Sequence, residues 1–229
     1  MYPELTQRRD GDVELPVLVW RPAGPVLMIS SGALGGGIGT RRWVINATVP
    51  MSYARPDPDA HLAELAGDLG LAGPGTGLLT GVDVATVVTA PDAGVTVWAT
   101  VGLTDPIWAA APPGVPPAAV GTVNVVAWVP ARLSEAALVN AVATVAEAKV
   151  QALVELEVPG TGTCTDATVL ACPTTGPVQP YGGPRSDWGA PLARAVYAAV
   201  LRGGRGTFGW PGSDRVRRDP PLPPGTNQT

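Results

Sequence analysis

Residues 134–166 read SEAALVNAVATVAEAKVQALVELEVPGTGTCTD and combine a long helical pattern with a Pro-Gly break and the expected start of a strand. Ser134 is a typical N-cap residue, and the glutamate after it suits the positive end of the helix dipole. The run of Ala, Leu and Glu residues predicts a helix as far as about Leu156, which Pro159 and Gly160 are expected to end. This stretch therefore predicts one long helix followed by a strand.

One basic residue lies on the apolar side of the predicted helix. At about 100° per residue, a single apolar stripe contains Leu138, Val142, Val145, Leu153 and Leu156. The opposite side carries Asn140, Thr144, Glu147 and Gln151. Lys149 falls in the middle of the apolar stripe, and it is the only lysine among the 15 Lys and Arg residues. A lysine in apolar surroundings must be paired, deprotonated or able to reach solvent, so Lys149 is either half of a structural ion pair or a site residue.

The predicted strand after the break begins near Thr163 and places Asp166 just inside it. Cys164 and Cys172 lie on this same predicted strand, and two residues of one strand cannot easily form a disulfide bond. The two cysteines are therefore expected to be reduced thiols, as in a cytoplasmic protein. Small buried residues are a more common role for them than nucleophiles.

Composition indicates a globular protein with a sizeable core. The chain has 229 residues, of which 45% are hydrophobic and 15% are charged. Its net charge of −4 and the lack of a dense basic run argue against a nucleic-acid groove. No apolar stretch approaches the roughly 18 residues of a membrane span, and the charged start lacks the apolar core of a signal peptide. We therefore expect a cytoplasmic protein with a single domain over residues 1–209 and a Pro-rich, disordered tail over residues 210–229.

The chain contains one histidine, which limits the available chemistry. A zinc site with several histidines is excluded, and a Ser-His-Asp triad would have to use His61 itself. His61 lies in a short amphipathic pattern, residues 57–71, where a place on a helix face is the more common role. Common metal-binding motifs are absent, so no protein-bound metal is expected.

The rest of the chain alternates short strand patterns with turns rich in glycine and proline. Strands are predicted over residues 15–22, 25–31, 43–49, 77–82, 85–90, 95–103 and 121–129. A final helix is predicted from about Ala190 to Leu201, ended by Gly203 and Gly204. Strict strand-helix alternation is missing. These patterns predict an α+β protein with mostly antiparallel or mixed β-sheets covered by about three helices, with a layered αββα sandwich as one arrangement.

The glycine-rich segment SSGALGGGIGT, residues 30–40, lacks the features of a phosphate-binding loop. No Gly-Lys-Ser/Thr sequence ends it, and its glycines do not match the GxGxxG spacing before a helix. Two interpretations remain: a turn between strands, or a segment whose backbone amides approach a bulky ligand. The Pro-rich segment of residues 106–117 is similarly either a surface connection or a lid over a site.

The chain contains, in this order, the motifs SSGALGGG, WVINATVP, GLLTGVDV, GTVNVVAWV, the EAK of residues 147–149, and GTGTCTD. This ordered set resembles the adenosylcobinamide amidohydrolase family. The resemblance covers roughly residues 26–203, and the common order of the motifs makes it specific. It implies hydrolysis of the amide that joins the aminopropanol arm of adenosylcobinamide to a propionyl side chain of the corrin ring. The product would be adenosylcobyric acid, an intermediate of cobalamin salvage. The cobalt would belong to the substrate, so no separate cofactor is implied.

Amide hydrolysis needs an activated nucleophile, stabilisation of the developing oxyanion and a proton for the leaving amine. Apolar surroundings disfavour the charged form of Lys149, which could protonate the amine or stabilise the oxyanion. Asp166 or Glu147 could act as the general base. Glu147 and Lys149 lie about 200° apart on a straight helix, so Asp166 is the expected partner of Lys149.

The corrin ring is large and edged with amides, so polar groups from several strands are expected to bind it. The candidate substrate-binding residues are Ser30, Ser31, Gly35, Gly36, Gly37, Asn46, Thr80, Thr122, Asn124 and Thr165. Ser30, Ser31 and Thr122 are also candidate nucleophiles for a covalent route. Trp98 and Trp108 are candidate packing partners of the ring, with core packing as the alternative.

Two other function classes stay open on the sequence alone. The chain can be a corrinoid-binding protein without catalytic activity, or a hydrolase of a different amide on the same scaffold. In each case the expected partner is a small molecule, with no nucleic acid and no membrane span. A homo-oligomer is compatible with the sequence.

Overall fold

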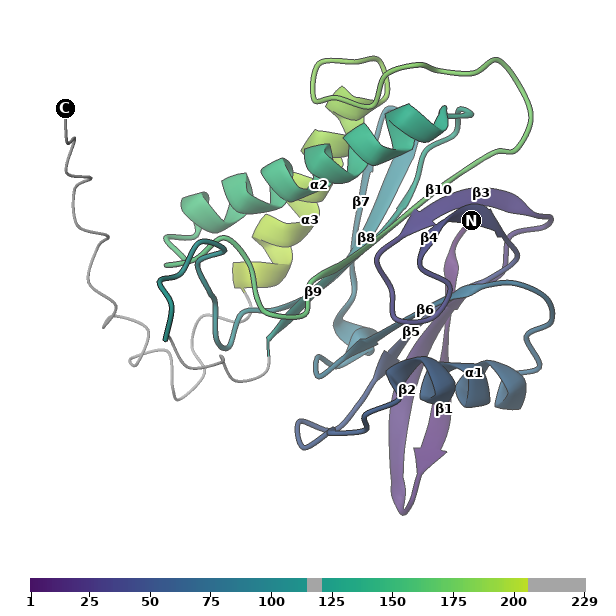
Figure 1. Cartoon of the computed structure of the whole chain (residues 1–229), viewed down its shortest axis with the longest axis vertical. Coiled ribbons are helices and arrows are strands. Elements are labelled where there is room, and N and C mark those ends of the chain that lie inside the picture. Colours follow the sequence, from purple (N-terminus) through teal and green to yellow (C-terminus); the bar gives the residue numbers. More distant parts are fainter. Residues whose placement is uncertain (115–120, 206–229) are drawn as a thin grey trace.

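The computed structural model describes residues 1–114 and 121–205 and arranges them in four layers (Figure 1). One helix, a four-stranded sheet, a six-stranded sheet and a pair of helices follow one another. The predicted α+β class and its αββα arrangement are confirmed, and both sheets are mixed. The tail predicted over residues 210–229 lies outside the described residues, as does part of the Pro-rich segment.

The first sheet has the strand order β1-β2-β5-β6. Its strands are β1 (Pro3–Asp10), β2 (Val13–Trp20), β5 (Val44–Thr48) and β6 (Thr76–Thr80). β5 and β6 are parallel, whereas the other neighbours are antiparallel. Helix α1 (Pro58–Asp68) covers the outer face of this sheet, where Leu62 and Leu65 share a buried cluster with Ile45.

The second sheet has the strand order β4-β3-β10-β9-β8-β7. Its strands are β3 (Val26–Ser30), β4 (Gly37–Arg41), β7 (Val88–Asp92), β8 (Val95–Gly102), β9 (Thr122–Trp128) and β10 (Ala167–Cys172). β9 and β10 are parallel, and the other neighbours are antiparallel. Helices α2 (Glu135–Glu155) and α3 (Gly189–Arg205) cover the outer face, and the short helix η1 (Val84–Thr86) precedes β7.

Side-chain alternation sends the residues of the central strands to two different cores. Val125 of β9 packs with the residues of α2 and α3. Its neighbour Val126 packs between the sheets with Val169, Trp20 and Trp98, and the two tryptophan rings meet edge to face. β9 and β10 are thus buried on both faces, which fits their nearly continuous apolar sequences.

Helix α2 starts at the predicted cap and ends before the predicted break. The Ser134 hydroxyl accepts a hydrogen bond from the backbone N–H of Ala137, with a distance of 3.0 Å, which confirms the N-cap. Glu157 has a φ of 56°, and the N–H of Val158 donates to the carbonyl of Leu153. This left-handed turn ends the helix before Pro159 is reached.

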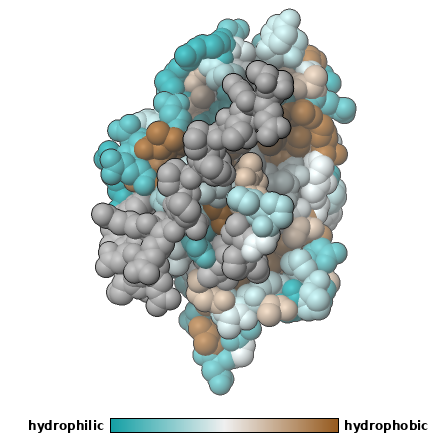
Figure 2. Space-filling model, turned by 60° about the vertical axis from the view of Figure 1, so that its left-hand side comes forward, coloured by the Kyte–Doolittle hydropathy of each residue, from teal (hydrophilic) through white to brown (hydrophobic). Residues whose placement is uncertain are grey.

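Helix α2 is long and apolar enough to cross a membrane by length and composition alone, contrary to the expectation that no apolar stretch approaches that length. In the structure, Leu138, Val145 and Leu153 are buried in the cluster shared with the second sheet and α3, which is the packing of a core helix. The face of the molecule in Figure 2 shows hydrophobic and hydrophilic residues interspersed. The described residues therefore give no evidence of a membrane span beyond the composition of this one helix.

Two strands were missed in the sequence. β1 has the polar sequence PELTQRRD, which lacks apolar alternation because the strand lies at the edge of its sheet and is largely exposed. β4, with the sequence GIGTR, forms the second half of the glycine-rich segment and pairs with β3 along its whole length. Glycine usually weakens a strand, so this segment was expected to be a turn throughout.

Several element boundaries differ from the prediction, and two of these differences, in β10 and α3, change how the elements are interpreted. β10 begins at Ala167 rather than near Thr163, so Asp166 precedes the strand and residues 161–166 form a loop. Helix α3 continues to Arg205 through Gly203 and Gly204. A side chain at either glycine would overlap neighbouring residues, so these glycines permit close helix packing instead of ending the helix.

Candidate active site

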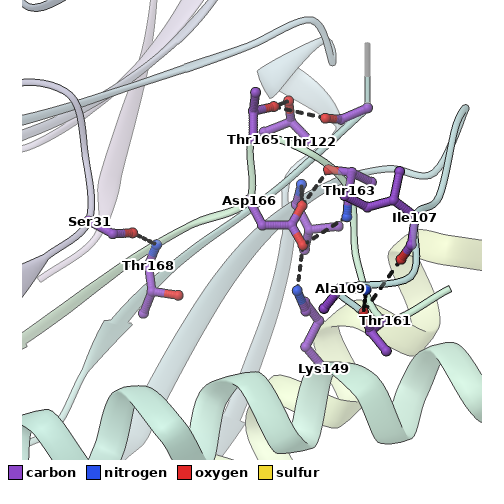
Figure 3. Close-up of polar contacts among 12 residues, drawn as sticks. Ser31, Ile107, Ala109, Thr122, Lys149, Thr161, Thr163, Thr165, Asp166 and Thr168 are labelled. Atoms are coloured by element: carbon purple, nitrogen blue, oxygen red, sulfur yellow. Dashed lines mark hydrogen bonds and ion pairs between the residues drawn. The ribbon is translucent and has the colours of Figure 1, made fainter. Parts of the chain in front are cut away.

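The candidate site lies where β9 and β10 begin. These parallel strands start side by side, because Ala167 of β10 pairs with Asn124 of β9. The loop of residues 161–166, called the Asp166 loop below, leads directly into β10, and α2 passes beside it (Figure 3). Side chains from a loop, a strand and a helix therefore meet at one end of the second sheet.

Lys149 of α2 and Asp166 form an ion pair between Nζ and Oδ2 (Figure 3). Their side chains are 15% and 16% exposed, so the pair is largely buried but still reaches solvent. The prediction that Asp166 is the partner of Lys149 is confirmed. An ion pair with this little hydration needs further hydrogen bonds to offset its loss of solvent.

Asp166 receives those hydrogen bonds from its surroundings. Oδ1 accepts from the backbone N–H of Val123, at 2.8 Å, and from the hydroxyl of Thr163. Oδ2 accepts from Lys149 and from the backbone N–H of Thr163, the latter at 3.2 Å. A carboxylate offers about four acceptor positions, so Asp166 is saturated in this arrangement. A further donor, such as an attacking water, can reach the carboxylate only after one of these four has moved away.

The Asp166 loop is fixed from its other side by the chain around Ile107. The N–H of Ile107 donates to the carbonyl of Gly162, and the N–H of Thr161 donates to the carbonyl of Ile107, each at 2.8 Å. The N–H of Ala109 donates to the Thr161 hydroxyl at 2.9 Å. A side chain at Gly162 would overlap both members of the ion pair, so glycine is required there.

Two threonine hydroxyls occupy the opposite face of the same strand ends. Thr165 Oγ1 donates to the carbonyl of Gly121 at 2.8 Å and lies 2.7 Å from Thr122 Oγ1. Because the Thr165 proton is used on Gly121, the Thr122 hydroxyl is the donor in the second contact. Thr165 is exposed, whereas Thr122 is buried.

Farther along β9, a neutral polar network joins the two sheets. Asn124 Nδ2 donates to Asn46 Oδ1 and to the carbonyl of Leu79, both at 3.0 Å. Asn46 Nδ2 in turn donates to Thr100 Oγ1 at 3.1 Å. Asn124 Oδ1 is buried and has no hydrogen-bond partner among the described residues. Asn46 and Asn124 thus lie together, and both are sealed from solvent.

The hydroxyls of Ser30, Ser31 and Thr80 accept hydrogen bonds from backbone N–H groups. Ser30 Oγ is buried, 2.8 Å from Thr76 Oγ1, and accepts from the N–H of Gly32. Ser31 is exposed and accepts from the N–H of Thr168 at 3.0 Å. Thr80 Oγ1 accepts from the N–H of Val82. Within residues 1–114 and 121–205, no hydrogen bond joins the hydroxyls of Ser30, Ser31 or Thr122 to the ion pair.

Gly35 of the β3–β4 connection lies against the chain's own backbone. Gly35 has a φ of 65°, and a side chain there would overlap the carbonyl of Gly75. Leu34 forms an isolated bridge with Gly77 of β6, which ties this connection to the first sheet. Gly36 and Gly37 are exposed. The turn between strands therefore accounts for Gly35 without a ligand.

Three other candidates lie apart from the ion pair. Glu147 is exposed, in agreement with the argument that it cannot share a site with Lys149 on a straight helix. Trp98 is a core residue between the sheets, whereas Trp108 is 48% exposed next to Ile107.

The histidine and the strand cysteine are structural residues. His61 is buried in α1, 3.0 Å from the Tyr53 hydroxyl through Nδ1, and burial lowers the pKa of His61. Burial raises the pKa of Cys172 in β10, whereas Cys164 is exposed in the Asp166 loop. Among the described residues, no three His, Cys, Asp or Glu side chains gather in a way that could hold a metal ion.

Sequence reasoning missed Thr163 and misjudged Thr144. Thr163 was read as the start of a strand, whereas its hydroxyl and backbone N–H both donate to Asp166. A Thr three residues before an Asp is a frequent local hydrogen-bonding pattern and could have suggested this contact. Thr144 was placed on the polar side of α2 but is buried, because its hydroxyl donates to the carbonyl of Gly182.

Comparison with known proteins gives consistent matches. The family model described as adenosylcobinamide amidohydrolase (CbiZ) matches residues 2–209. The adenosylcobinamide amidohydrolase of Methanosarcina mazei is 31% identical over 184 residues, which cover 76% of this chain and 88% of that protein. Its namesake in Halobacterium salinarum is 36% identical over 183 residues, covering 75% of this chain and 77% of that protein. A crystal structure of a Pyrococcus horikoshii protein has a TM-score of 0.40 at 14% identity, covering 84% of this chain and 77% of that one. On the family match and these two relatives, the chain belongs to the adenosylcobinamide amidohydrolase family.

Proposed function

We propose that this protein hydrolyses the amide that joins the aminopropanol arm of adenosylcobinamide to the corrin ring. The products are adenosylcobyric acid and free aminopropanol, and the acid re-enters cobalamin synthesis. Membership of the family and the names of the two curated relatives support the reaction. The observation that carries it is the Lys149–Asp166 pair, in which the chain's only lysine meets a carboxylate at a partly open site.

The two charged groups match what amide hydrolysis requires. A cation beside the scissile carbonyl stabilises the oxyanion that develops on attack, and it can then protonate the departing amine. A carboxylate can accept a proton from the attacking water. All acceptor positions of Asp166 are occupied while Lys149 contacts it. Lys149 must therefore leave Asp166 before the carboxylate can accept a proton from water.

A single movement of Lys149 separates them. In our proposal the ammonium leaves Asp166 Oδ2 for the substrate carbonyl oxygen, which leaves Oδ2 open toward water. Asp166 accepts a proton from the attacking water, and Lys149 donates a proton to the amine as the C–N bond breaks. Asp166 then returns its proton to Lys149 when the pair forms again. The balance is one water and one amide converted to one acid and one amine.

This route is preferred to a covalent one on the contacts of the candidate nucleophiles. Ser30 and Thr122 are buried, and the hydroxyl of Thr122 donates to Thr165. A serine or threonine nucleophile needs an adjacent base, and the hydrogen bonds described above give none of these hydroxyls a contact with Asp166. An acyl-enzyme trapped with a slow substrate and located by mass would overturn direct attack by water.

The test of the function is the release of aminopropanol from adenosylcobinamide, followed by mass spectrometry. Wild-type protein is expected to release it, and Lys149→Met protein is not. Binding without turnover would favour a corrinoid-binding protein, and turnover of simple amides alone would favour a different amidohydrolase. We also infer that no protein-bound metal takes part, since the cobalt is part of the substrate. Dialysis against a chelator should therefore leave turnover unchanged.

A further inference from the structure

The two oxygens of Asp166 have different kinds of partner. Oδ1 accepts from the N–H of Val123 and from the hydroxyl of Thr163, whereas Oδ2 accepts from the ammonium of Lys149 and from the N–H of Thr163. In the proposed hydrolysis Oδ2 must stay directed at the site after Lys149 leaves. The two hydrogen bonds to Oδ1 oppose rotation of the carboxylate after Lys149 has left Oδ2. Of the two donors to Oδ1, Thr163 is the one supplied by a side chain.

The packing of Thr163 fixes the direction of its hydroxyl. Thr163 is buried, and a Cβ built on Gly121 would lie only 3.0 Å from Thr163 Cγ2. The methyl group therefore packs directly on the backbone of Gly121, which leaves the hydroxyl facing Asp166. A β-branched residue has few rotamers to begin with, so this contact selects one of them.

The backbone of Thr163 is held as firmly as its side chain. Its N–H donates to Asp166 Oδ2 at 3.2 Å, and the preceding Gly162 is paired with Ile107. Thr163 thus reaches both oxygens of the carboxylate from a loop with little freedom to move. Figure 3 shows Thr163 and Lys149 approaching Asp166 from different sides.

We propose that Thr163 is a positioning residue for amide hydrolysis, holding Asp166 Oδ1 so that Oδ2 faces water once Lys149 has moved to the substrate. The inference rests on the proposed function and adds to it a residue that makes no contact with the scissile amide. Because Thr163 acts through Asp166, its loss should slow the chemical step and leave substrate binding largely intact.

The experiment compares kcat and KM for adenosylcobinamide in four proteins. Thr163→Val keeps the shape of the side chain but loses the hydroxyl, and kcat should fall about 10- to 100-fold, as expected for a hydrogen bond to a charged group. KM should stay within about twofold of the wild-type value. Thr163→Ser restores the hydroxyl and should keep kcat within about threefold of wild type.

Thr86→Val in η1 is the matched control, because its hydroxyl donates to the carbonyl of Asp83 rather than to Asp166 or its loop. Melting temperatures are measured for every variant, and all assays are run well below the lowest of them. A wild-type kcat in Thr163→Val, a similar loss in Thr86→Val, or a raised KM with unchanged kcat would each overturn the positioning role. Wild-type protein that releases no aminopropanol overturns the proposed function itself, which separates the two failures.

Discussion

The starts of β9 and β10 carry two polar clusters that differ in charge and in access to solvent. On the α2 side, the Lys149–Asp166 pair is charged and partly open. On the side of the first sheet, Asn46 and Asn124 are neutral and sealed. Formal charges are costly to seal completely, whereas neutral amides can be buried once hydrogen-bond partners are supplied. The same strand ends therefore support proton chemistry on one face and the joining of two sheets on the other.

The largest expected effect tests the charged face. Lys149→Met keeps the length of the side chain and removes the ammonium, so kcat should fall by about 10²- to 10⁴-fold, the usual contribution of an acid-base group. Arg194→Met is the control, because it removes a cation from an exposed pair with Asp92 and should leave kcat unchanged. Steady-state kinetics with adenosylcobinamide gives both values. A fully active, folded Lys149→Met protein would reject the assignment of chemistry to this face.

The second effect tests the neutral face. Asn124→Leu leaves Asn46 Oδ1 and the carbonyl of Leu79 without their buried donor, so the free energy of unfolding should fall by about 2–4 kcal/mol. Urea denaturation followed by circular dichroism measures the loss. The control is Asn140→Leu at an exposed position of α2, where a change within about 0.5 kcal/mol is expected. Equal stability of the two variants would show that the amide network does not hold the sheets together.

A third variant sharpens the comparison at the ion pair itself. Gly162→Ala places a methyl group where Lys149 and Asp166 meet, so the pair must separate and kcat should fall about tenfold or more. Gly67→Ala in α1, where a methyl group meets open space, is the matched change and should have no effect on kcat. Parallel assays of the two variants decide the point. Retained activity in Gly162→Ala would mean that the close contact of the pair is not needed.

The smallest effect concerns the two thiols, one in the Asp166 loop and one at the far end of β10. Burial raises the pKa of Cys172, so its thiol stays protonated above the usual range and should react slowly with a thiol reagent at pH 8. Cys164 is exposed and should react quickly. Mass spectrometry of native protein should show one modification, and denatured protein should show two. Two fast modifications in the native protein would contradict the burial of β10.

The sequence predicted the helix that carries Lys149 better than the loop that carries Asp166. The serine N-cap, the apolar stripe and the single lysine within that stripe are all local features of the sequence. Local features are enough to predict where a helix lies and which of its faces is buried. The partner of Lys149 also followed, because Glu147 lies on the other side of the helix and Asp166 was the other candidate base.

The contacts that could not be predicted depend on parts of the chain that are distant in sequence. Asp166 accepts a hydrogen bond from the N–H of Val123, which lies in β9. The buried hydroxyl of Thr144 donates to the carbonyl of Gly182, 38 residues farther along the chain. The polar edge strand β1 has no apolar alternation because one neighbour alone holds it. A sequence pattern indicates which face of a segment is buried. The contacts of Asp166 and Thr144 and the edge position of β1 depend instead on which distant segments pack together.

The position of Asp166 has a consequence for how the molecule acquires its activity. Its carboxylate accepts hydrogen bonds from Val123 of β9, from Thr163 of its own loop and from Lys149 of α2. A folding intermediate in which the sheet has formed but α2 has not docked would have the acid without its cation, and so would be inert. Hydrolysis thus requires α2 to be docked on the sheet, and recovery of turnover during refolding should not precede that docking.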